Sequence, residues 1–160
     1  MPLNQPVVSG PGAGRAMTYG SGSSAGLKLA GEQSPGDFAA VVWRLRAGDE
    51  PPLHTHTRED ETVYVLEGAI TAHVAYQRID VDAGSYAALP KNVPHGLSVR
   101  GEEACLLVTL EPAAAEYFLV PGDDSDADPR RFGNRHPRQH ARDVRHPRAD
   151  IACPPSCTEP

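Results

Sequence analysis

Three histidines and one glutamate are spaced along the middle of this chain as the ligands of one metal ion would be. His54 and His56 are two residues apart, so on a β-strand both imidazoles point to the same face. Glu61 stands at the start of an apolar run, where it can supply a carboxylate from a neighbouring strand, and His95 comes from a distant strand. Imidazole and carboxylate donors without thiolates suit Fe, Mn, Co, Ni or Zn. We therefore predict one divalent transition metal, with coordination positions left open for a substrate.

Short β-like runs separated by turn residues would position these side chains. A chain of 160 residues fits a single domain with a core, and its 15 glycines and 16 prolines indicate many turns. The pattern is typical of a double-sheet jelly roll or barrel. A short helix is expected over 112–119, where helix formers follow a proline. The expected strands are 25–30, 38–45, 62–66, 69–76, 78–81, 86–89, 96–99 and 104–110.

The two ends of the chain differ in composition from its centre. Residues 1–24 are rich in Gly, Ser and Pro, and we expect an extended or disordered arm before a barrel over 25–120. Residues 121–160 contain few apolar side chains, so burial cannot offset the entropy of ordering them, and a flexible tail is expected.

The tail also holds side chains that could be mistaken for a second site. Its histidines alternate with Arg and Pro, which makes a preorganised metal site unexpected at His136, His140 and His146. Cys153 and Cys157 are interpreted as reduced thiols because no further Cys or His pair lies at zinc-site spacing, and Cys105 as a small buried hydrophobe.

Charge and hydropathy exclude several classes of partner. The net charge of −6 argues against nucleic acid or an anionic membrane as partner. No apolar run approaches the roughly 20 residues of a membrane span, and the first residues lack the basic and apolar regions of a signal peptide. A cytoplasmic protein with a small-molecule substrate is the resulting expectation.

Two linked motifs resemble those of the cupin superfamily. The first, G-x5-H-x-H-x4-E-x6-G, is matched throughout, by Gly48, His54, His56, Glu61 and Gly68. The second, G-x5-P-x-G-x2-H-x3-N, is matched by Gly84, Pro90 and His95, whereas Asn92 and Val99 replace its second glycine and its asparagine. The resemblance covers roughly residues 20 to 118. It implies an all-β double-stranded β-helix and, since cupins often pair through their sheets, a homodimer.

The resemblance also implies roles for individual residues. His54, His56 and His95 would be metal ligands, and Glu61 would be both a ligand and the general base. The motif spacing selects Glu61 over its neighbours Glu59 and Asp60, which we expect to be solvated. His73 lies on the strand between the motifs, and we interpret it as a structural or pocket-wall residue.

Counting by twos along the strands suggests a largely apolar pocket. From Glu61, the count turns Val63 and Val65 inward. On another strand either Phe38, Ala40 and Val42 or Ala39, Val41 and Trp43 would point inward; the pocket wall is predicted from Phe38, Val42, Val63 and Val65. Few charged groups project from these faces, which suits an aromatic or polyketide-like substrate.

The motifs and their flanks are similar to small single-domain bacterial cupins of the quercetin 2,3-dioxygenase type. In such proteins a divalent metal binds a deprotonated flavonol, a glutamate acts as base and O₂ opens the ring. The resemblance implies a dioxygenase acting on a flavonol-like, polyphenolic or polyketide-type enolisable substrate. Two alternatives remain open: a non-oxidative metal-dependent cyclase, isomerase or lyase of secondary metabolism, and a cupin that binds a small molecule without turnover.

Overall fold

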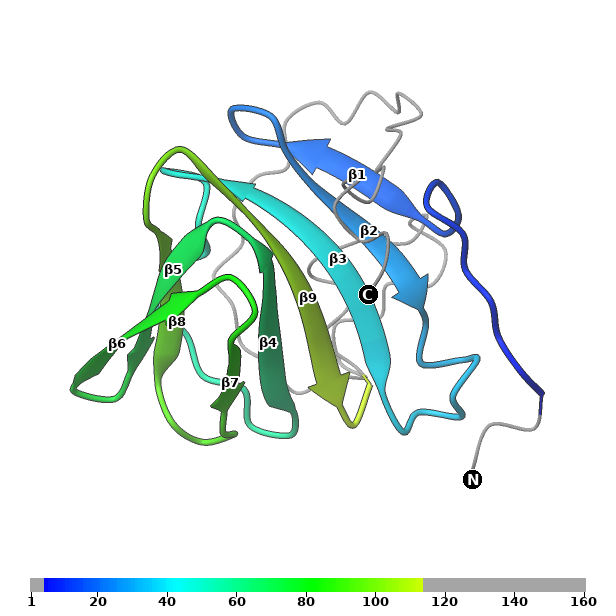
Figure 1. Cartoon of the computed structure of the whole chain (residues 1–160). Helices are drawn as coiled ribbons and strands as arrows, with labels where there is room; N and C mark the ends of the chain where they lie inside the picture. Colours follow the sequence, from blue (N-terminus) through cyan, green and yellow to red (C-terminus); the bar gives the residue numbers. More distant parts are fainter. Residues whose placement is uncertain (1–4, 114–160) are drawn as a thin grey trace.

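The computed structural model describes residues 5–113, which form nine β-strands in two antiparallel sheets (Figure 1). Six strands form one sheet in the order β1-β2-β3-β9-β4-β7, and three form the other in the order β6-β5-β8. The strands are β1 Ala16–Tyr19, β2 Ser23–Leu29, β3 Ala39–Arg46, β4 Asp60–Glu67, β5 Ala69–Val74, β6 Gln77–Asp82, β7 Tyr86–Leu89, β8 His95–Val99 and β9 Glu103–Glu111. The expected all-β barrel is confirmed.

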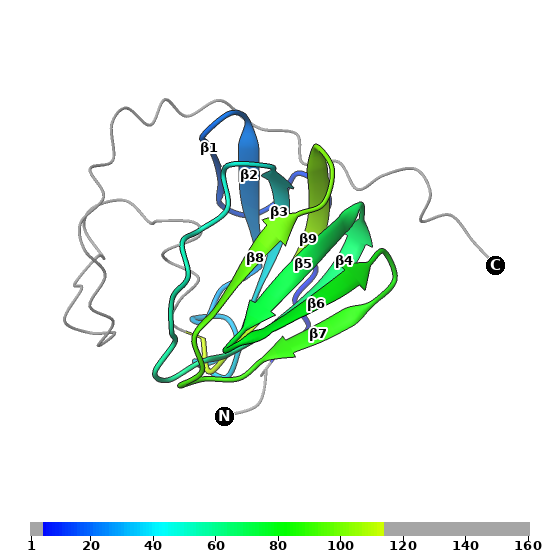
Figure 2. The ribbon, with the colours of Figure 1, turned by 90° about the vertical axis from the view of Figure 1, so that its left-hand side faces the viewer.

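The hydrophobic core lies between the two sheets and draws side chains from both. Val41, Val63 and Leu106 come from the large sheet, and Ile70 and Leu97 come from the small one. Figure 2, in which the small sheet faces the viewer, shows β8, β5 and β6 in front of β3 and β9. Because buried and less buried residues alternate along β3 and β4, each strand gives every second side chain to this core.

Strand β4 carries Glu61 into the barrel on the same face as two core valines. Glu61, Val63 and Val65 are buried, while the intervening positions of β4 are more exposed. Glu61 lies opposite Leu110 of β9 and Leu89 of β7, each 1% exposed. The count by twos from Glu61 thus gives the observed faces, and the carboxylate has apolar neighbours on both flanking strands.

The N-terminal arm contributes a strand that the sequence pattern did not reveal. Strand β1 pairs with β2 at the edge of the large sheet, although residues 1–24 were expected to form an extended or disordered arm. Its four residues show no run of buried positions, so hydrophobic patterning gives little signal. The arm is held to the barrel by the indole N–H of Trp43, which donates to the hydroxyl oxygen of Tyr19, and burial raises the pKa of that hydroxyl.

Two expectations fall on the C-terminal part of the chain. The helix expected over 112–119 lies almost wholly, and the tail over 121–160 entirely, outside the described residues. Within residues 5–113, no helix has the length and apolar character needed to cross a membrane.

Gly68 is the one residue between β4 and β5, where the chain passes from the large sheet to the small one. Its φ is +73°, and a Cβ built there would lie 2.6 Å from the carbonyl oxygen of Glu103. Both the backbone angle and the close approach require glycine.

Substituting Gly68→Ala should lower the free energy of unfolding by about 2–3 kcal/mol, through strain at positive φ and the clash with β9. Gly84→Ala is the matched control, because Gly84 has a φ of +83° and no atom within 4 Å of its would-be Cβ. Strain alone should cost it about 1–2 kcal/mol. Urea denaturation of both variants measures the difference, and equal losses would contradict the role given to the close approach.

Candidate metal centre

The first two histidines lie in the connection between β3 and β4, outside the regular strands. His54 forms an isolated antiparallel bridge with His95, the first residue of β8. The His54 N–H donates to the His95 carbonyl at 2.9 Å, and the His95 N–H returns a bond to the His54 carbonyl at 2.8 Å. This pair of backbone bonds brings ligands from the two motifs side by side.

A second backbone bond ties the connection to the turn before β8. The N–H of Asn92 donates to the carbonyl of His56 at 2.7 Å, and Asn92 has a φ of +62°. The left-handed conformation explains why the corresponding position of the cupin motif is glycine, and Asn tolerates it better than most residues. The departure from the motif at Asn92 therefore leaves the turn and its contact with His56 intact.

Four donor atoms converge inside the barrel. Nε2 of His54 lies 3.2 Å from Nε2 of His56, which in turn lies 3.2 Å from Oε2 of Glu61. Nε2 of His95 lies 3.6 Å from the same oxygen, and donor atoms of all four residues lie within 4.8 Å of one another. Two metal–ligand bonds of about 2.1 Å at a right angle span about 3.0 Å. The separations therefore fit a shared metal ion.

The Nδ1 atoms of two of the histidines form backbone hydrogen bonds that direct their Nε2 atoms inward. The Nδ1–H groups of His54 and His95 donate to the carbonyl oxygens of Pro52 and Val93, each at 2.9 Å. These bonds select the tautomer in which Nε2 carries the lone pair. Nε2 of His95 is buried and has no hydrogen-bond partner. A buried nitrogen in this state fits a coordinating role, because such groups otherwise find a donor or a water.

Electrostatics keep two of the ligands in their coordinating forms. Burial alone raises the pKa of Glu61, but the interactions of its carboxylate with the His56 and His95 rings outweigh burial and lower that pKa to about 2. Burial lowers the pKa of His54. At neutral pH Glu61 is therefore a carboxylate and His54 a neutral imidazole, the forms that donate electron pairs to a metal.

Of the two acidic neighbours of Glu61, one lies where it was expected and the other does not. Asp60 accepts hydrogen bonds from the backbone N–H and the Nζ of Lys91 at the surface. Glu59, also expected to be solvated, is 0% exposed. The expectation for Glu59 is wrong, because the chain directs this side chain inward two positions before Glu61, on the same alternation.

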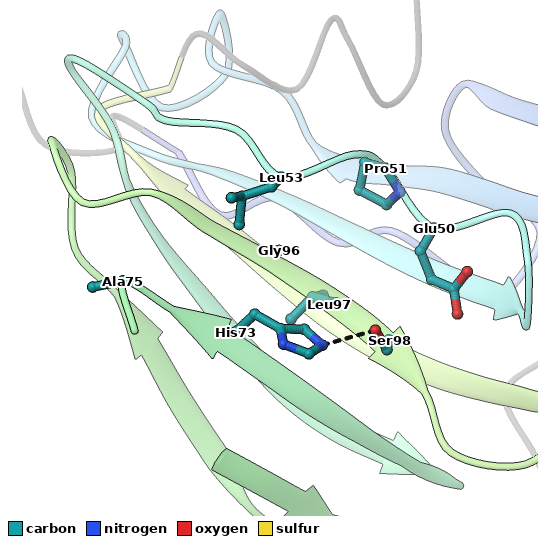
Figure 3. A pocket seen from close by; sticks show the side chains of 8 residues that line it. All are labelled: Glu50, Pro51, Leu53, His73, Ala75, Gly96, Leu97 and Ser98. Atoms are coloured by element: carbon teal, nitrogen blue, oxygen red, sulfur yellow. Dashed lines mark hydrogen bonds between the residues drawn. The ribbon is translucent and has the colours of Figure 1, made fainter. Parts of the chain in front are cut away.

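His73 stands apart from the four converging residues. Its Nε2 is 2.8 Å from Oγ of Ser98, on the face of the small sheet opposite the core (Figure 3). Both residues line a surface hollow of about 460 Å³, together with Glu50, Leu53 and others. The hollow lies beside Leu53 and Gly96, which are the sequence neighbours of His54 and His95.

The predicted pocket wall has one error of register. Val63 and Val65 are fully buried on the Glu61 side of β4, and Phe38 is partly buried just before β3. Val42, however, lies on the less buried face of β3, and Val41 and Trp43 point into the core instead. The apolar run 38–43 by itself does not separate the two registers, but Arg44 and Arg46, which share the face of Val42, mark that face as the outer one.

Comparisons with known proteins agree with this fold. Residues 41–111 match the family model described as a cupin domain. The chain is 28% identical over 116 residues to the quercetin 2,3-dioxygenase of Bacillus subtilis (strain 168). That match covers 71% of this chain but 34% of the relative, so the chain spans about a third of the length of that curated protein.

Two solved structures share the fold at low sequence identity. An RmlC-like cupin from Shewanella frigidimarina has a TM-score of 0.60 at 22% identity, covering 72% of this chain and 98% of that one. A predicted oxalate decarboxylase from Thermotoga maritima has a TM-score of 0.61 at 17% identity, covering 66% and 99%. Residues 41–111 thus match a cupin domain, and the two-sheet barrel shares its fold with both of these structures.

Proposed function

We propose that this cupin is a metal-dependent dioxygenase acting on a flavonol-like, polyphenolic or polyketide-type enolisable compound. The observation that carries the metal-dependent part is the convergence of His54, His56, Glu61 and His95 on one point inside the barrel. The resemblance to a protein named quercetin 2,3-dioxygenase supports the choice of reaction and substrate class. The ligand set alone suits Fe, Ni, Co, Mn and Zn.

A divalent metal held by these four residues would supply Lewis acidity toward a substrate hydroxyl. Glu61, which is ionised at neutral pH, would accept the proton of that hydroxyl on a carboxylate oxygen, with the pKa of the hydroxyl lowered by the metal. The backbone-anchored rings of His54 and His95 would hold their positions during this transfer.

Apolar neighbours favour an aromatic or enolic substrate at this place. Val63 and Val65 follow Glu61 along the buried face of β4, and Leu89 and Leu110 lie opposite Glu61 on the adjacent strands. Such surroundings exclude water and strengthen electrostatic interactions with the carboxylate.

Metal uptake provides the first test. The wild-type protein should bind one equivalent of Ni²⁺ or Co²⁺, and His95→Ala should weaken that binding by about 100-fold or more, because a ligand is lost. Competition with a chromophoric chelator measures the affinity. His73→Ala is the control, because His73 lies on the outer face of the small sheet. Failure of the wild type to bind metal would refute the proposed function.

Oxygen consumption tests the reaction class. The metal-loaded protein, offered a panel of flavonols including quercetin, should consume one O₂ for each flavonol that disappears. An oxygen electrode and product mass spectrometry make the two measurements. Turnover of the panel under anaerobic conditions would instead indicate a non-oxidative enzyme, and binding without a product would indicate a binding protein.

Glu61→Gln should reduce turnover more than tenfold, because it removes the proton acceptor and the anionic ligand together. Glu67→Gln on the same strand is the control, since Glu67 lies at the surface near Arg44. Steady-state kinetics with a saturating metal concentration separates the two variants. Activity above a tenth of the wild-type value in Glu61→Gln would count against the assigned role.

A further inference from the structure

A second buried carboxylate lies beside the metal centre without a conventional partner. Glu59 is 0% exposed, and neither of its carboxylate oxygens has a hydrogen-bond partner. Its closest ionisable contact places Oε2 at 3.6 Å from Nδ1 of His56. Burying a carboxylate costs several kcal/mol unless a charge or hydrogen bonds compensate it. The position of Glu59 therefore calls for a compensating positive charge.

The environment of His56 differs from that of the other two histidines in one respect. His54 and His95 each donate from Nδ1 to a backbone carbonyl, whereas Nδ1 of His56 is buried with no hydrogen-bond partner. Glu59 faces that nitrogen, so it occupies for His56 the place that the carbonyls of Pro52 and Val93 occupy for the others. A separation of 3.6 Å is too long for a hydrogen bond, and a movement of about half an ångström would close it.

The net charge of a metal-loaded centre would account for the buried Glu59 carboxylate. A divalent ion held by three neutral imidazoles and the Glu61 carboxylate would leave one net positive charge in a buried site. The Glu59 carboxylate would cancel that charge. The Glu59 carboxylate lies on the Nδ1 side of the His56 ring, whereas Nε2 of His56 is the nitrogen that faces His54 and Glu61. Glu59 would therefore act through His56 and not as a fifth ligand.

We propose that Glu59 is a positioning residue that holds the His56 ring through Nδ1 and balances the charge of the bound metal. This inference rests on the proposed metal-dependent function and adds to it a determinant of metal affinity that does not touch the metal. Carboxylate–histidine–metal arrangements of this kind fix the ring and raise its basicity as a ligand.

The test compares Glu59→Gln with Asp60→Asn, which removes the same charge one residue away at the surface. The Ni²⁺ affinity of Glu59→Gln should fall by about 10- to 100-fold, and that of Asp60→Asn should change by less than about threefold. The amide of Asp60→Asn can still accept the Lys91 N–H bond. The metal-free Glu59→Gln protein should melt no lower than the wild type, because it loses a buried unpaired charge.

A spectroscopic readout separates positioning from a purely structural role. In Zn²⁺-loaded protein, the side-chain ¹⁵N resonance of His56 Nδ1 should move in Glu59→Gln and stay unchanged in Asp60→Asn. Glu59→Asp keeps the charge on a shorter side chain and should recover part of the lost affinity, which also keeps the proposal testable if Glu59→Gln folds poorly.

Two results would overturn the proposal: one would refute only the role of Glu59, and the other would also refute the metal centre. If the wild type binds Ni²⁺ and Glu59→Gln binds it within about threefold as tightly, the role of Glu59 is wrong while the metal centre stands. If the wild type takes up no Ni²⁺, Co²⁺ or Zn²⁺, both the metal centre and the role of Glu59 are wrong.

Discussion

The two backbone hydrogen bonds between His54 and His95 are the constraint on which the centre depends. The connection that carries His54 and His56 has no regular strand geometry to aim its side chains. The pairing of His54 with His95, the first residue of β8, gives this connection a strand-like geometry at His54. The contact of Asn92 with the His56 carbonyl holds the other end of the short segment. Metal-ligand geometry thus rests on a few backbone bonds between a loop and the barrel.

Around this pairing, each imidazole has a polar group facing its Nδ1. Carbonyls of the local chain orient His54 and His95, and a carboxylate faces His56. Because carbonyls are neutral and Glu59 is an acid, the three rings would differ in basicity although they belong to one ligand set. The three histidines therefore differ in the groups that face their Nδ1 atoms, although all three present Nε2 to the centre.

Much of this arrangement could be predicted from residue spacing, and the parts that could not have specific physical causes. The period of two along β4 predicts the inward direction of Glu61, Val63 and Val65 because polar and apolar residues alternate there. The prediction was wrong at Val42, because the register was read from the apolar run 38–43 and not from Arg44 and Arg46, which mark the face of Val42 as the outer one. At Glu59 the period of two also points inward, but the side chain was expected to be solvated, because no local pattern encodes its tertiary contact with His56.

Two of the four candidate ligands lie in strands and two lie in a connection, and this division affects how the sequence of such a protein can evolve. Glu61 and His95 belong to strands β4 and β8, so substitutions near them also disturb the core. His54 and His56 belong to a connection that contributes no residue to the hydrophobic core cluster among the described residues. The exposed positions of that connection can accumulate substitutions without disturbing the core, so they offer a route by which related barrels could exchange one metal preference for another.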